Sequence, residues 1–216
     1  MPPEGPGSLV AELRKFARSR APRPAPAPAR SPEAGPEERC DFCSTTIPAA
    51  HRHMLDVEER SILCACEACL VRQAADPRYR PTGRRLVALD DFYMSDEIWS
   101  RFQVPVSLAF FLHSASAGKV IVLYPSPIGA TESELDLGAW ETLSEANPVL
   151  RGLEPDAEAL LVWRAGAGPH HFIAPIDDCY RLVGLIKTRW QGISGGQEAE
   201  AAIEEFFAEL RDRAVP

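Results

Sequence analysis

Five of the six cysteines lie within 30 residues of one another, at Cys40, Cys43, Cys64, Cys66 and Cys69. Their spacing is C-x2-C, then 20 residues, then C-x-C-x2-C. A C-x2-C turn allows two thiolates to converge on one ion, and two such turns supply a closed tetrahedron of sulfur, which suits zinc or iron. An odd number of clustered thiols fits disulfide pairing poorly, so the spacing favours a metal site.

The predicted ligands are one pair from each C-x2-C turn: Cys40, Cys43, Cys66 and Cys69. Cys64 is the alternate or extra ligand, because in a strand its side chain faces the same side as that of Cys66. His51 and His53 leave two interpretations open. Either one histidine replaces a cysteine as a ligand, or one lies on the surface while the other hydrogen-bonds a ligand.

Zinc is the predicted metal, and iron is the alternative. Two C-x2-C turns also build a rubredoxin-like single-iron site, and four cysteines can hold an iron–sulfur cluster. However, the common ferredoxin spacings are absent from the sequence. In addition, Asp41 and Glu67 occupy turn positions where iron sites often carry small or apolar residues. The ligand chemistry therefore favours zinc.

Residues 40–81 are predicted to form a cysteine-rich, metal-binding module that brings the two turns together. Short strands are expected over 53–57 and 61–64, followed by a helix over 67–75 whose first turn carries Cys66 and Cys69. Turn, hairpin, then turn plus helix is an order typical of a treble-clef or zinc-ribbon-like fold. A segment of about 40 residues needs a metal or a similar staple to stay folded.

Residues 82–216 are predicted to form an acidic α+β domain, an antiparallel sheet covered by helices. Strands are expected over 86–89, 104–113, 119–124, 159–164 and 170–174, with a loop over 125–131. Helices are expected after Ser95, around Trp140, over 179–190 and over 203–210, and either Asp177 or Asp178 is expected to cap the third.

Residues 1–39 are predicted to form an amphipathic helix and a proline-rich linker. Leu9, Leu13 and Phe16 share one helical face, and nine of the 20 prolines precede residue 40. A helix this short is marginal alone. We expect it to dock either on its own chain or on a partner.

The charge distribution argues against nucleic acid as a partner. Residues 86–216 carry nine Lys and Arg against twenty Asp and Glu, and a surface of that sign repels phosphate backbones. We expect no membrane span, since the apolar runs are short. The first residues lack an apolar signal core, which predicts a cytoplasmic protein.

No catalytic constellation stands out in the sequence, which predicts a non-enzymatic protein. His170 and His171 are interpreted as an exposed hairpin flank, with a proton-transfer site as the alternative. Cys179 shares an apolar helical face with Leu182 and Ile186, so a buried, inert thiol is expected. The sequence contains no nucleotide-binding, nucleophile-elbow or H-E-x-x-H motif.

Several longer runs carry a family resemblance. These are CDFC…IPAAHRHMLDVEERSILCACEACLVR, VIVLYPSPIGATESELDL, ALLVWR and CYRLVGLIKTRWQGISGG. Over residues 40–213 the chain resembles an uncharacterised bacterial family, of actinobacterial type, found with the genes of nickel–iron hydrogenases and their accessory proteins. The resemblance implies hydrogenase components as partners and a role for the five clustered cysteines. It implies no mechanism.

Three functional hypotheses follow. The first is a non-enzymatic, zinc-binding accessory or interaction protein linked to hydrogenase assembly or function. The second is an electron-transfer protein that binds iron through the same cysteines. The third is a maturation hydrolase that uses the C-terminal domain, which a deep pocket gathering His170 and His171 with acidic residues favours.

Overall fold

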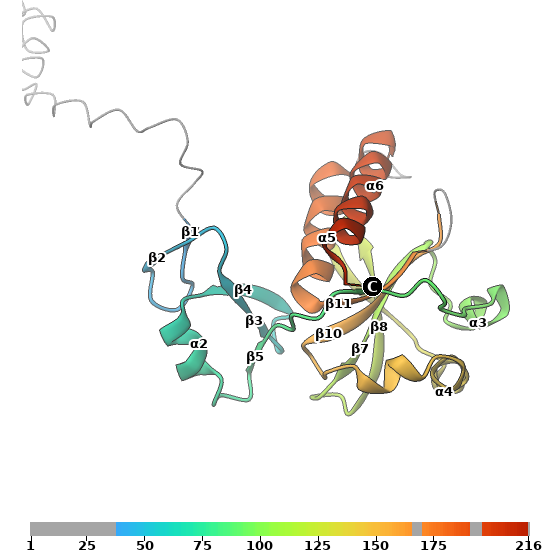
Figure 1. Ribbon diagram of the computed structural model, residues 1–216, viewed down its shortest axis with the longest axis horizontal. Helices are drawn as coiled ribbons and strands as arrows, with labels where there is room; N and C mark the ends of the chain where they lie inside the picture. Colours follow the sequence, from blue (N-terminus) through green and yellow to red (C-terminus); the bar gives the residue numbers. More distant parts are fainter. Residues whose placement is uncertain (1–37, 166–169, 191–195, 216) are drawn as a thin grey trace, which may run out of the picture. The chain divides into compact units, whose positions relative to one another are not determined.

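A six-stranded antiparallel sheet is the centre of the C-terminal part of the chain (Figure 1). The computed structural model describes residues 38–165, 170–190 and 196–215. The strand order is β6-β11-β10-β7-β8-β9. The strands are β6 (Val87–Ala88), β7 (Leu108–Ser114), β8 (Lys119–Ser126), β9 (Gly129–Ser133), β10 (Glu158–Trp163) and β11 (His170–Pro175).

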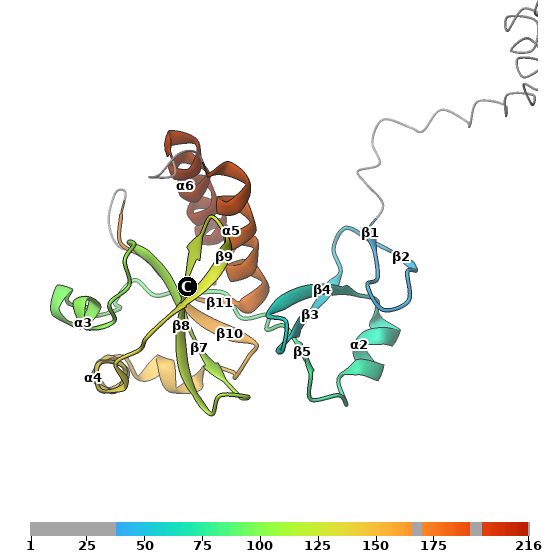
Figure 2. The ribbon, with the colours of Figure 1, turned by 180° about the vertical axis from the view of Figure 1, so that it is seen from behind.

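Helices cover both faces of this sheet, which confirms the predicted α+β class (Figures 1 and 2). Along β10, Leu161 and Trp163 pack with α5 (Ile176–Arg189) and α6 (Gly196–Arg213). The alternate residues of β10 pack on the other face, with α3 (Asp96–Arg101), α4 (Leu137–Ala146) and the 3-10 helix η1 (Pro148–Gly152). Because both faces are buried, the middle of each central strand is a continuous apolar run, and polar residues such as Glu158, His113 and Ser114 lie at the strand ends.

The cysteine-rich part contains two small antiparallel sheets and one short helix. The elements are β1 (Glu38–Arg39), β2 (Thr46–Ile47), β3 (Arg52–Asp56), β4 (Ser61–Ala65), α2 (Glu67–Gln73) and β5 (Tyr79–Pro81). β1 pairs with β2, and β3 lies between β4 and β5. Asp56 is 3% exposed; it accepts two hydrogen bonds from Arg78 and two from the amides that turn β3 into β4.

The predicted N-terminal helix and linker, residues 1–39, lie outside the described residues except for β1. Contact density assigns residues 37–216 to one unit. The part of the chain that the structure describes contains no helix long and apolar enough to cross a membrane.

Two local predictions are wrong. The predicted loop 125–131 is instead the end of β8 and the start of β9, joined by a tight turn after Ser126. The run GATES lacks apolar alternation because β9 is an edge strand that is only partly buried. The predicted cap of α5 by Asp177 or Asp178 is also absent, since both carboxylates bind side chains elsewhere in the fold.

The interpretation of His170 and His171 as an exposed flank is also wrong. His171 is 7% exposed and packs against Phe92, with ring centroids 4.7 Å apart. His170 stacks on Trp163. The second hairpin is therefore buried at this end, because α6 and the residues after β6 cover it.

We expect replacement of His171 by leucine to reduce the loss of stability that acid causes. Burial lowers the pKa of His171 to about 4, and the charges of Arg164 and His170 add to the effect. An unfolded histidine titrates near pH ~6.5, so the unfolded chain takes up the proton first as the pH falls. Stability present above pH ~6.5 is therefore lost towards pH ~4, by up to about 3 kcal/mol.

Urea unfolding at pH 7 and near pH 4 checks this expectation. Stability of the leucine variant relative to the native protein should rise as the pH falls. His113→Leu, in the same sheet, is the control and should follow the native protein. A constant difference between the His171 variant and the native chain would contradict the assignment.

Candidate metal centre

The four cysteines of the two C-x2-C turns come together. One sulfur from each of Cys40, Cys43, Cys66 and Cys69 lies within 4.8 Å of the other three. The Sγ atoms of Cys43 and Cys66, one from each turn, are 3.7 Å apart. Four sulfurs placed about 2.3 Å from a central ion at tetrahedral angles are separated by about 3.8 Å. The cluster therefore has the donors and the dimensions of a four-thiolate metal site.

The first turn is held in shape by the β1–β2 pairing. The Cys40 amide donates to Thr45, and the Ser44 amide donates to the Cys40 carbonyl at 2.8 Å. Ser44 closes the turn in the left-handed region, with φ 58°. Asp41 ties the turn to β4 twice: its amide donates to the Cys64 carbonyl, and its carboxylate accepts from the Cys64 amide at 2.6 Å.

The second turn is the start of α2. Cys66 precedes the first helical residue, and its carbonyl accepts the Leu70 amide at 2.9 Å. Cys69 lies one turn later and is 5% exposed. Residues three apart on a helix share a face, so the sulfurs of Cys66 and Cys69 both point towards the turn that carries Cys40 and Cys43. Cys43 is exposed, whereas Cys40 and Cys69 are buried.

The thiols of the cluster are electrostatically coupled. Burial opposes ionisation of Cys40, but amide donors from Cys66, Phe42 and Cys43 outweigh it and lower the pKa of Cys40 to about 6. Burial and hydrogen bonds among the thiols raise the pKa of Cys69 to about 12. Metal ligands must be deprotonated thiolates, so a bound cation would displace the protons of these thiols.

Cys64 lies in a second group, with His51 and His53. One ligand atom from each of these three residues lies within 4.8 Å of the other two. β4 ends at Ala65, so Cys66 leaves the strand and does not share a face with Cys64. Burial raises the pKa of Cys64, and the negative charges of Asp41 and Glu38 add to the effect. The same charges favour a cation beside this thiol.

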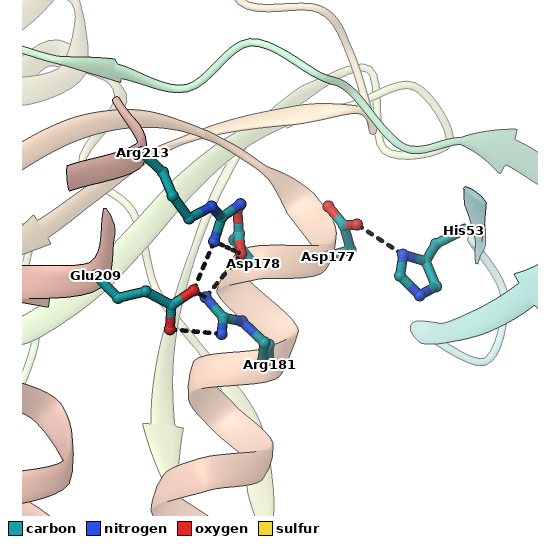
Figure 3. A network of polar contacts seen from close by, with 6 residues as sticks. All are labelled: His53, Asp177, Asp178, Arg181, Glu209 and Arg213. Atoms are coloured by element: carbon teal, nitrogen blue, oxygen red, sulfur yellow. Dashed lines mark hydrogen bonds and ion pairs between the residues drawn. The ribbon is translucent and has the colours of Figure 1, made fainter. Parts of the chain in front are cut away.

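His53 also contacts the C-terminal part of the chain. Its Nδ1 lies 2.9 Å from Oδ2 of Asp177, on the first turn of α5 (Figure 3). The neighbouring Asp178 belongs to a separate network with Arg181, Arg213 and Glu209, which joins α5 to α6. Sequence reasoning did not find Asp177 as a partner, because it is 124 residues away.

A cleft with a volume of about 1290 Å³ lies beside His51 and His53. Its wall includes Asp177 and Tyr180 of α5, and it is open to solvent. His170 and His171 do not line it. A deep pocket that gathers these two histidines with acidic residues would favour a hydrolase. The described clefts contain no such pocket.

The fold and the cluster define an α+β protein with a cysteine-rich site that could hold a metal ion. The chain belongs to the DUF5947 family, a family of unknown function, whose match covers residues 39–214. No curated protein and no solved structure matches it.

Proposed function

We propose that the protein is a non-enzymatic, zinc-binding accessory protein, and that Cys40, Cys43, Cys66 and Cys69 hold one structural zinc ion. The observation that carries the proposal is the closure of the four sulfurs into one group within 4.8 Å. All four positions of a tetrahedral ion are then filled by protein, which is typical of structural rather than catalytic zinc. Turn, β3–β4 hairpin, turn and α2 occur in the order of a treble-clef module.

The small core of this module supports a structural role. Apart from Cys40 and Cys69, its cluster around the metal site contains only Ile47 as a buried hydrophobic residue. The other buried apolar side chains of this part, Met54, Leu55 and Ala65, lie on β3 and β4. The two cysteine turns therefore have little apolar burial of their own, and a metal ion is suited to hold them together. A reducing compartment such as the cytoplasm keeps thiolate ligands intact, and we propose the cytoplasm as its location.

Metal analysis of purified protein, with its absorption spectrum, tests the choice of zinc over iron. We expect zinc at the four-cysteine site, no visible absorption band because the d shell of zinc is full, and no redox titration. Iron at this site with a reversible redox titration would contradict the proposal and support the electron-transfer alternative.

We further propose that the module binds a protein partner through α2. Val71 on this helix is 73% exposed, so it is an apolar side chain that α2 can offer to a partner. The sequence resemblance makes nickel–iron hydrogenase components the first partners to test. Co-purification with co-expressed hydrogenase components should occur and should be weakened by Val71→Asp. Equal recovery of these components with the native protein and with Val71→Asp, or no recovery with either, would contradict a contact through α2.

A further inference from the structure

The β3–β4 hairpin places a second set of metal donors next to the four-cysteine site. His53 and Cys64 are directly opposite each other in the antiparallel ladder. His51 immediately precedes β3, and its ring packs against that of His53 with centroids 4.6 Å apart. An H-x-H pair thus faces a cysteine on the neighbouring strand, and the three donors lie within 4.8 Å of one another.

The hydrogen bonds of the two histidines leave one nitrogen of each ring available. Nδ1 of His51 lies 3.0 Å from the Pro48 carbonyl and 3.0 Å from Glu38. Nδ1 of His53 lies 2.9 Å from Asp177. A ring nitrogen that donates to an oxygen fixes the tautomer and leaves Nε2 with a free lone pair, the usual arrangement of a metal-binding histidine.

Two buried side-chain atoms near these histidines have no hydrogen-bond partner in the described part of the chain. The His51 side chain is 5% exposed, and its Nε2 has no hydrogen-bond partner within the described part of the chain. Oδ1 of Asp177 is likewise buried and has no hydrogen-bond partner there. Buried polar atoms are almost always satisfied in folded proteins, so both point to a group that belongs beside the histidines.

We propose that His51, His53 and Cys64 form a second zinc site, with one coordination position open to the cleft. Three protein ligands and a free fourth position are the arrangement of zinc sites that bind water or substrate. Asp177 is a positioning residue, since its carboxylate orients His53. This site lies beyond the proposed structural role of the four cysteines.

The cleft beside the open position suits a small anion. Arg52, Arg84 and Lys187 line it and form no ion pair within residues 38–165, 170–190 and 196–215. The wall also carries acidic residues, but its six Arg and Lys outnumber its four Asp and Glu, so the cleft is net basic in a chain of net charge −8. A phosphate or carboxylate group would gain both the zinc ion and these charges as partners.

Metal stoichiometry tests the site directly. Protein reduced, loaded with zinc and freed of excess metal should contain about two zinc ions per chain, one in each group. His51→Ala/His53→Ala and Cys64→Ala should each contain about one. His113→Ala and Cys179→Ala, which change residues outside both groups, should retain about two. A native protein that holds one ion, or a histidine double variant that holds two, overturns the proposal.

Cobalt tests the open position. In cobalt-loaded native protein, added inorganic phosphate should shift the visible d–d absorption, and the double histidine variant should show no shift. Two bound ions with a spectrum that phosphate leaves unchanged would overturn the anion-binding part. Asp177→Asn should keep the bound metal but weaken its affinity about 10- to 100-fold; an unchanged affinity would remove Asp177 from the site.

These outcomes separate the inference from the proposed function. If the four cysteines hold iron, the native protein should contain iron together with about one zinc ion per chain. The double histidine variant should then lose the zinc and keep the iron. The second site would in that case stand while the structural zinc assignment fails.

Discussion

Replacement of Cys43 by serine is expected to release the metal of the four-cysteine site and to unfold the two cysteine turns with α2, while the six-stranded sheet stays folded. Cys43 is exposed, so a serine hydroxyl there remains solvated. Any loss of metal or of structure is then caused by the missing thiolate alone. Binding of structural zinc contributes about 10–16 kcal/mol in zinc-finger peptides. Around the two turns, the buried apolar cluster consists of Cys40, Ile47 and Cys69, which is too little to replace that contribution.

Hydrogen exchange resolves the two parts of the chain. Amides of α2 should lose protection in Cys43→Ser, whereas those of β7 and β10 should keep it. Chelation of the native protein should reproduce the pattern, and Cys179→Ala is the matched control because that thiol lies outside the cluster. Full protection of α2 without metal would show that the two turns fold without a bound ion.

Replacement of Arg85 by methionine is expected to lower the free energy of unfolding by about 3–5 kcal/mol. Glu158 opens β10 and is 5% exposed. Its oxygens accept from Arg85 at 2.6 and 3.1 Å and from the Glu154 amide at 3.2 Å. Without the guanidinium, a charged carboxylate stays buried at the first residue of a central strand, which costs far more than an exposed pair.

Two further variants test this cause. Glu158→Gln added to the Arg85 variant should recover part of the loss, because no charge is then buried. Arg101→Met is the control, since its partner Asp136 is 40% exposed and exposed pairs contribute about 0–1 kcal/mol. Equal losses in urea unfolding for Arg85→Met and Arg101→Met would show that burial of Glu158 does not matter.

Local spacing was enough to predict that the four cysteines would meet. A C-x2-C turn is a short-range feature, and Cys66 and Cys69 are close wherever a helix begins between them. The apolar runs of β7, β8, β10 and β11 were likewise visible, because a strand buried on both faces leaves a continuous signal.

What spacing could not predict depends on where strands end and on distant partners. Cys64 joins the histidines because β4 stops one residue before Cys66, and element boundaries are set by tertiary packing as much as by local sequence. Asp177 has the residue type and position expected of a helix cap, yet its carboxylate binds His53. β9 was missed because an edge strand needs no apolar alternation.

The two edges of the large sheet differ in how they are closed. At β6, Val215 forms a parallel bridge with Val87, and its amide donates to Leu86 at 3.1 Å. At β9, the outer strand carries Glu132, which pairs with Arg60. Unpaired edges are templates for intermolecular strand addition. The backbone of Val215 thus covers the β6 edge, whereas charged side chains lie at the β9 edge. Removal of Val215 should therefore expose the β6 edge and increase aggregation through strand addition.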